Sequence, residues 1–206
     1  MGALLPYGDR AVLFECDDEH PCRLAERLRG REMWQGDGPI EVVPGARTIL
    51  LSFAQAVDSI DILGVLDRAR EGVGAEAART PEVVEIQVVY DGDDLPALAE
   101  ETGRPVEEII ASHSAAAHVV DFCGFAPGFA YMSGLPEWMH VARLATPRTR
   151  VPAGSVAIAA GWSAVYPGES PGGWRLIGRT DAVMFDPDRA KPALLPPGTE
   201  VRFVPR

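Results

Sequence analysis

Lysine is almost missing from this chain of 206 residues: Lys191 is the only lysine among 19 basic residues. A Schiff-base lysine, the lysine of a phosphate-binding loop or a biotinylated lysine would therefore have to be Lys191. Its surroundings, Ala-Lys-Pro-Ala-Leu-Leu, are typical of none of these sites. The excess of arginine indicates codon bias, so no single arginine stands out by residue type alone.

Cysteine is scarce as well, and long apolar runs are absent. Cys16, Cys22 and Cys123 form no CxxC pair, which argues against a disulfide framework and a zinc knuckle. No run approaches the roughly 18 apolar residues of a membrane helix, and the N-terminus has no basic region followed by an apolar stretch. These absences predict a cytoplasmic protein with no membrane contact and no metal motif.

Basic residues are few relative to acidic ones. Nineteen Lys and Arg stand against thirty Asp and Glu, a net charge of −11, which argues against a nucleic-acid partner. The chain is 47% hydrophobic and long enough to bury one good core or two small ones.

The first 90 residues alternate between strand-like and helix-like segments, with Asp17 or Asp18 and Asp58 or Ser59 as helix caps. The expected order is strand 11–16, helix 21–29, strands 40–43 and 48–54, a helix ending at 70, and strand 82–90. This β-α-β-β-α-β order is that of a ferredoxin-like domain, but the last strand fits equally well as the start of a second domain. Residues 72–81 are expected to form an exposed linker.

Residues 95–117 predict two short helices broken at Thr102-Gly103, a spacing that imitates a DNA-binding helix-turn-helix. The second helix carries Glu107 and Glu108 and no basic residue beyond Arg104 at its start, which argues against that function. From His118 onward, glycines and prolines separate short apolar runs. This pattern predicts strands of a compact barrel or sandwich, closed by runs at 182–185 and 200–204.

Residues 118–180 differ in charge from the rest of the chain. They hold five arginines and three acids, a local charge of +2 in a protein of −11. Guanidinium groups bind carboxylates and phosphates through two hydrogen bonds, so this stretch is a candidate anion site. Ordinary surface arginines would give the same count, and the charge alone does not separate the two interpretations.

Three longer strings lie in this region: GFAPGFAYMSGLP (124–136), TPRTRVPAGSVAI (146–158) and YPGESPGGWRLIGRT (166–180). Together they closely resemble the family of 5-oxoprolinase B subunits, also called the Kip-inhibitor or allophanate hydrolase subunit 1 family. The resemblance continues through His113-Ser114-Ala115 and through FDPDRAKPALLPPGTEVRFVP near the C-terminus, so it covers nearly the whole chain.

The resemblance implies an α+β chain with a ferredoxin-like domain over residues 1–80 and a cyclophilin-like β-barrel over residues 81–206. It implies a protein that works with the C and A subunits of the enzyme to open 5-oxo-L-proline to L-glutamate with ATP hydrolysis. Other members of this fold inhibit a sensor histidine kinase or form half of a biotin-dependent urea-type carboxyltransferase. These remain alternative functions, and biotin is implied only by the last.

The sequence departs from the family at two places. The family usually has Gln-Thr-Gly-Ile-Tyr-Pro where this chain has Trp-Ser-Ala-Val-Tyr-Pro after Gly161, and it often has Tyr-Arg where this chain has His118-Val119. Both departures concern the specificity for the small molecule.

His113, Arg148 and Arg179 are the candidate catalytic residues. Imidazole titrates near neutral pH, so His113 is a candidate general base or substrate hydrogen-bond partner; the alternative is a partly buried histidine at the end of its helix. Arg148 and Arg179 are candidates to clamp the substrate carboxylate or a phosphoryl group. The sequence contains no GxxxxGK[ST] loop, so ATP is expected to bind unconventionally, jointly with a partner, or elsewhere.

The candidate substrate-binding residues share a position in Gly- or Pro-rich turns of the three strings. They are Phe125, Pro127, Gly128, Tyr131, Pro152, Gly154, Ser155, Tyr166, Ser170, Pro171, Gly172 and Gly173. Such turns line sites because they bring backbone N–H groups close to a ligand. Trp174 is expected in the barrel core rather than in a pocket wall.

Overall fold

The structure is a computed structural model that describes residues 2–16, 21–34, 36–57, 61–73 and 83–206. The predicted caps at 17, 18, 58 and 59 lie outside the described residues, as does nearly all of the predicted linker 72–81. By their contacts the residues form two compact units, Met1–Thr80 and Pro81–Arg206.

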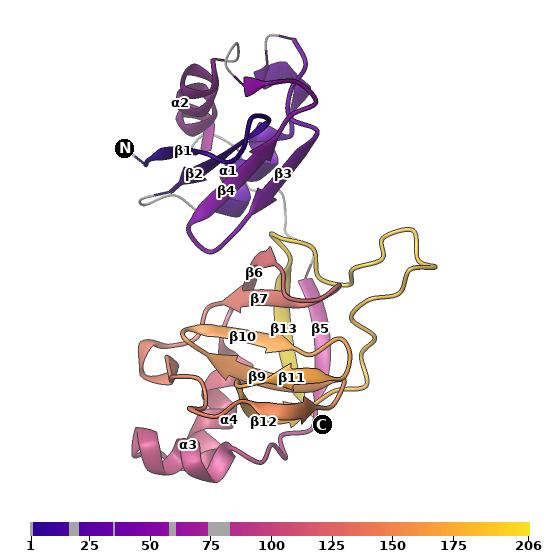
Figure 1. Ribbon diagram of the computed structural model, residues 1–206. Coiled ribbons are helices and arrows are strands. Elements are labelled where there is room, and N and C mark those ends of the chain that lie inside the picture. The colour runs from indigo at the N-terminus through magenta and orange to yellow at the C-terminus, as the bar shows by residue number, and fades with distance from the viewer. Residues whose placement is uncertain (1, 17–20, 35, 58–60, 74–82) are drawn as a thin grey trace. The chain divides into compact units, whose positions relative to one another are not determined.

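The first unit is a four-stranded antiparallel sheet with two helices (Figure 1). Its strands, in the spatial order β1-β2-β4-β3, are β1 (Leu4–Pro6), β2 (Ala11–Glu15), β4 (Thr48–Ser52) and β3 (Glu41–Pro44). Its helices are α1 (Pro21–Leu28), α2 (Ile62–Val73) and the short 3-10 helix η1 (Arg31–Met33). Burial alternates along β2, β3 and β4, as expected for a sheet with one covered face.

The core of this unit is apolar. Phe14, Ile49 and Leu51 from the strands meet Leu24 and Leu66 from the helices, and each is at most 1% exposed. Burying an aliphatic side chain of this size contributes about 1.5–3 kcal/mol, so these contacts are the main source of the unit's stability.

The strand predicted over residues 82–90 joins the second unit instead of the first. It forms β5 (Val83–Val88), which pairs in parallel with β13 (Glu200–Pro205). The edge beside β2 is taken by β1, a short strand that the sequence did not predict. The sequence allowed this strand either to end the first domain or to begin the second, and in the structure it begins the second.

The second unit is a seven-stranded sheet in the order β12-β9-β10-β7-β6-β13-β5, which curls into an almost closed barrel (Figure 1). Its further strands are β6 (His118–Cys123), β7 (Ala130–Ser133), β9 (Ser155–Ala159), β10 (Trp162–Val165) and β12 (Arg175–Arg179). Just beyond β5, Val89 and Arg179 exchange two backbone hydrogen bonds of 2.9 Å. This single bridge connects β12 with the segment that follows β5, so the sheet is almost closed.

Two helices, a 3-10 helix and a two-stranded ribbon complete the second unit. They are α3 (Leu95–Thr102), α4 (Val106–Ala115), η3 (Glu137–Met139), and the ribbon of β8 (Arg148–Val151) with β11 (Ser170–Gly172). The predicted break between the helices is confirmed, because Gly103 ends α3 in the left-handed conformation with φ 66°. The prediction of a strand over 182–185 is wrong: only an isolated bridge between Phe185 and Ala193 forms there.

Strand β9 is buried on both faces, and this divides the second unit into two apolar clusters. Val156 and Ile158 point into the barrel interior, whereas Ala157 and Ala159 face a second cluster on the outside of the barrel. Because successive side chains of a strand point to opposite faces, neighbouring residues of β10 are divided in the same way.

Candidate functional site

An aromatic cluster lies on part of the outer face of the barrel. Phe122, Phe125, Phe129, Tyr131, Trp162, Tyr166 and Trp174 form this cluster, in which rings of neighbouring members lie 4.3–6.4 Å apart. Phe129, Tyr166 and Trp174 are buried, whereas Tyr131 and Trp162 are half-buried and Phe125 is 62% exposed. The structure thus brings Phe125, Tyr131 and Tyr166 together from two of the three sequence strings.

The Gly-Phe-Ala-Pro-Gly loop holds Phe125 in an unusual conformation. Phe125 has φ 69°, one of two positive values at non-glycine positions among the described residues. Gly128 has φ 81°, and a Cβ atom there would lie 2.7 Å from Cβ of Phe185. Strained backbone of this kind concentrates at ligand sites, so the exposure of Phe125 supports a binding role for this loop.

Gly172 makes room for the phenol of Tyr166. A Cβ atom at position 172 would lie 2.2 Å from Oη of Tyr166. The neighbouring Gly173 is not restricted in this way, because its Cβ would make only ordinary contacts with Pro147. Ser170 lies on the same strand, and its hydroxyl is buried without a hydrogen-bond partner among the described residues, while Pro171 is exposed.

Ser155 follows a turn that only glycine can form. Gly154 has φ 78°, and a Cβ atom there would lie 2.2 Å from the carbonyl oxygen of Thr180. The hydroxyl of Ser155 donates to the carbonyl of Pro152 at 2.8 Å, and the residue is buried. The turn therefore exists as predicted, but its hydroxyl serves the turn itself in this conformation.

His113 lies inside the barrel and is fully buried. Its Nδ1 is 2.8 Å from Oη of Tyr90, and its Nε2 is 2.9 Å from Oγ of Ser163. Nε2 of His118 donates to the carbonyl of His113 at 2.9 Å. Burial, together with the nearby His118, holds the pKa of His113 well below its ordinary value, so the ring is neutral near pH 7.

His113 and the aromatic cluster are on opposite sides of the same sheet. Ser163, the partner of His113, points inward from β10, whereas its neighbours Trp162 and Ala164 belong to the outer cluster. Both ring nitrogens of His113 are occupied by protein groups. His113 therefore orders the interior in this conformation and does not face a ligand bound on the aromatic cluster.

Arg148 is fixed by a buried carboxylate. Its Nη2 donates to Oδ1 of Asp94 at 2.7 Å, and Oδ2 of Asp94 accepts the backbone N–H of Leu176 at 2.6 Å. The side chain of Asp94 is 8% exposed and that of Arg148 is 26% exposed. This charge is largely neutralised, and its evident effect is to tie β8 to the start of α3 and to β12.

Arg179 lies at the bridge that closes the barrel. Its side chain is exposed and its Nε donates to Asp91 at 2.9 Å. It lines a cavity of about 320 Å³ together with Glu85, Gln87 and Arg206. The structure places no other candidate residue from the sequence at this cavity, so Arg148 and Arg179 do not lie in one site.

Arg143 is a further candidate binding residue that was not selected from the sequence. Its guanidinium carbon is 5.9 Å from the ring centroid of Trp174, and no ion pair of Arg143 occurs among the described residues. Burial raises the pKa of Tyr131 and that of Tyr166; the positive charge of Arg143 opposes both shifts, and that of Arg148 opposes the shift of Tyr166 as well. The local surplus of positive charge was the signal that pointed to it.

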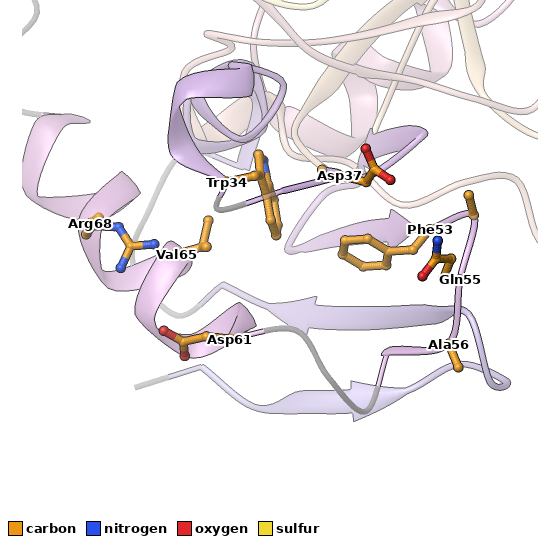
Figure 2. A pocket seen from close by; sticks show the side chains of 10 residues that line it. Trp34, Asp37, Phe53, Gln55, Ala56, Asp61, Val65 and Arg68 are labelled. Carbon is orange, nitrogen blue, oxygen red and sulfur yellow. The ribbon is translucent and has the colours of Figure 1, made fainter.

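A second cavity, of about 300 Å³, lies in the first unit (Figure 2). Trp34, Phe53 and Val65 form its apolar floor, and the polar groups around it belong to Asp37, Gln55, Asp61 and Arg68. Asp61 accepts the N–H of Gly64 in the first turn of α2, so it also caps this helix. None of the candidate site residues selected from the sequence lies in the wall of this cavity.

Metal sites and membrane-spanning helices are both absent from the part of the chain that the structure describes. No group of three or more His, Cys, Asp or Glu side chains there is placed to hold a metal ion. No described helix combines the length and the apolar character that crossing a membrane requires.

The chain is similar to curated proteins over almost its whole length. Residues 3–195 match the family "Carboxyltransferase domain, subdomain C and D". The chain is 40% identical to the 5-oxoprolinase B subunit of Escherichia coli O157:H7, over 97% of this chain and 94% of that protein. It is 46% identical to the Haemophilus influenzae protein of the same name, over 59% of this chain and 58% of that protein.

Solved structures share the fold. The protein TTHA0988 is similar with a TM-score of 0.76 and 31% identity, over 96% of this chain and 39% of that longer chain. The urea amidolyase of Kluyveromyces lactis has a TM-score of 0.69 over 100% of this chain and 15% of its own, but only 20% identity, so it supports the fold alone. The almost closed sheet of the second unit is consistent with a cyclophilin-like fold.

Proposed function

The chain belongs to the family of 5-oxoprolinase B subunits, and on that premise we propose that it serves as the B subunit of an ATP-dependent 5-oxoprolinase. The observation that carries the proposal is the 40% identity to a protein of that name over 97% of the chain. The enzyme would open the lactam ring of 5-oxo-L-proline to L-glutamate. Its other components would be the C and A subunits, as the sequence resemblance implies.

The reaction needs activation because a lactam is a stable amide. In the proposed scheme ATP transfers its terminal phosphoryl group to the lactam oxygen, giving a phosphorylated imidate and ADP. Water then attacks the activated carbon and the ring C–N bond opens, which leaves a γ-glutamyl phosphate with a free amine. A second water attacks the carbon of this acyl phosphate, giving L-glutamate, and phosphate leaves with the oxygen it received. Cationic groups of the complex would stabilise the charge that develops at these steps.

This chain would supply a binding surface to that scheme rather than a complete catalytic centre. The aromatic cluster with the Phe125 loop supports this role, because it is a partly exposed surface with a strained loop. His113 would act as a positioning residue, holding Tyr90 and β10 from inside the barrel. Because the sequence has no GxxxxGK[ST] loop, the nucleotide would bind with the help of the partner proteins.

The finer fold assignment is part of the proposal. We assign the first unit to the ferredoxin-like class, with β1 in place of the usual last strand, and the second unit to the cyclophilin-like barrels. The domains would be residues 1–80 and 81–206. The complex is proposed to work in the cytoplasm, where three cysteines without a CxxC pair are expected to stay reduced.

The two alternatives receive no comparable support. The three curated relatives all carry the name of the 5-oxoprolinase B subunit, and none is named as a kinase inhibitor. The similarity to urea amidolyase is at 20% identity and bears on the fold only. A carboxyltransferase role would also require a biotinylated partner, because Lys191 is the only lysine of this chain and its surroundings are not those of a biotinylated lysine.

The test is an assay of glutamate release from 5-oxoproline with ATP. The chain alone should release little or no glutamate, and activity should appear when the C and A subunits from the same source are added. Omission of ATP is the control. Full turnover by the chain alone, or none by the complete mixture, would contradict the assignment.

A further inference from the structure

The five arginines of residues 118–180 are not equivalent in the structure. Four of them face a carboxylate: Arg148 with Asp94, Arg150 with Glu169, Arg175 with Glu101, and Arg179 with Asp91, at 2.6–2.9 Å. Among the described residues, Arg143 forms no such pair. An arginine already paired has little free charge for a ligand, so Arg143 carries the local surplus.

The backbone on both sides of Arg143 is held to the barrel. The carbonyl of Val141 accepts the N–H of Ala160 at 2.8 Å, and the N–H of Leu144 donates to the carbonyl of Gly173 at 2.7 Å. The carbonyl of Ala142 accepts from Nε of Arg175 at 3.2 Å. The position of Arg143 is therefore built into the fold, although its side chain is exposed.

The groups beside Arg143 suit a small carboxylate. The ring of Trp174 lies under the guanidinium, with its centroid 5.9 Å from the guanidinium carbon, and the ring of Tyr131 lies 5.5 Å from that of Trp174. Tyr131 is half-buried and burial raises its pKa, so its phenol stays protonated near pH 7 and can donate a hydrogen bond. Tyr166 is only 1% exposed and its hydroxyl lies against Gly172, so it supports the cluster from inside. Trp174 is itself 4% exposed, so its ring supports the guanidinium from within the cluster.

We propose that Arg143, rather than Arg148 or Arg179, binds the carboxylate of 5-oxoproline beside the aromatic cluster, with Tyr131 as a hydrogen-bond donor. The identity of the ligand rests on the proposed function, whereas the preference for a small carboxylate rests on the side chains themselves. Arg143 is in this view a specificity residue, because it recognises the group that distinguishes the substrate from a plain lactam.

The test compares two ligands and two variants. Dissociation constants of 5-oxoproline and of 2-pyrrolidinone, the same ring without the carboxylate, are measured by calorimetry for the chain alone and for the complex with its partners. Arg143→Gln should raise the dissociation constant of 5-oxoproline about 10- to 100-fold and leave that of 2-pyrrolidinone unchanged. Arg150→Gln, which removes the same charge from the same segment, should leave both unchanged. Tyr131→Phe should weaken 5-oxoproline about 3- to 10-fold.

The possible outcomes separate this inference from the proposed function. If the wild-type complex releases glutamate but Arg143→Gln binds 5-oxoproline normally, the inference fails and the function stands. If the complex is inactive but the chain binds small carboxylates through Arg143, the function fails and the inference stands. Three results for Arg143→Gln would each overturn the carboxylate role: equally weaker binding of both ligands, weaker binding of inorganic phosphate alone, or loss of binding to the partner subunits. No binding of 5-oxoproline to either wild-type form would do the same.

Discussion

The two units of this protein fill their interiors with different chemistry. Among the described residues, every buried polar or charged residue belongs to the second unit: Asp94, His113, His118, Ser155, Ser163 and Thr199. The residues that the structure describes as buried in the first unit are all apolar. An apolar core tolerates changes of side chain that keep its volume, whereas a buried polar network stays stable only if its hydrogen bonds are kept.

This difference indicates which unit depends on a fixed arrangement of its side chains. The second unit uses Asp94 and His113 to tie helices to strands, and the strands so fixed carry the aromatic cluster on their outer face. A polar link specifies direction as well as proximity, because a hydrogen bond weakens steeply when its angle is wrong. We therefore expect the second unit to be the more sensitive one to loss of a single polar group.

The largest effect is expected from His113→Ala. The change leaves the buried hydroxyl of Ser163 and the half-buried hydroxyl of Tyr90 without their partner and opens a cavity, so it should lower the stability of the second unit by about 3–5 kcal/mol. Hydrogen exchange followed by mass spectrometry measures this locally. Amide protection should fall in residues 155–166 and stay unchanged in residues 41–52.

Ser114→Ala is the matched control for that change. Its hydroxyl bonds only to carbonyls of its own helix, so the loss should stay below about 1 kcal/mol. If His113→Ala weakened protection equally in both units, the units would unfold as one and the comparison between them would not hold.

An intermediate effect is expected on acidification. The folded-state pKa of His113 and that of His118 are both lowered, chiefly by burial, from an ordinary value of 6.5. Below that value the unfolded chain binds protons that the folded chain does not, so stability falls as the pH falls. The slope should reach about 1.4 kcal/mol per pH unit for each histidine, with full stability above pH 6.5.

Denaturant titrations between pH 7.5 and 5 check this slope. The loss should be confined to the second unit, because none of the buried residues described in the first unit is a histidine. A pH dependence that appears only in the first unit would contradict the role of the two buried histidines.

The smallest effect is expected from Ile49→Val in the first unit. Ile49 is fully buried between sheet and helices, and loss of one methylene should cost about 0.5–1.5 kcal/mol. Protection should fall in residues 41–52 only, and the activity of the assembled enzyme should be unchanged. A loss of activity at full occupancy of the complex would show that the first unit takes part in the function directly.

Much of the fold could be predicted because local patterns agree with the tertiary structure. The apolar runs at 11–16, 48–54 and 200–204 form β2, β4 and β13, and Gly103 separates α3 from α4 as its residue type suggests. The strand predicted over residues 182–185 does not form because a strand also needs a pairing partner, and the only pairing described there is one bridge between Phe185 and Ala193. Strand β1 was missed because three residues that include a proline carry almost no periodic signal.

The candidate site was predicted in part for a similar reason. The three strings identified the family and the aromatic residues, since their order and spacing are visible in the chain itself. Sequence alone does not show which arginines face a carboxylate, because Asp94 lies 54 residues from Arg148 and Asp91 lies 88 residues from Arg179. These long-range pairs decide which charge is left for a ligand, and they leave Arg143.

The sequence by itself determined the family and the order of most elements, and it selected the region of the candidate site, because each of these is written in local patterns of residue type. The tertiary structure alone decided that β5 completes the second unit, that His113 faces the interior, and that the aromatic cluster faces outward. The physical reason is that the side of a sheet on which a residue lies depends on strand pairing. A pairing between distant segments puts neighbours such as Trp162 and Ser163 on opposite faces of one strand.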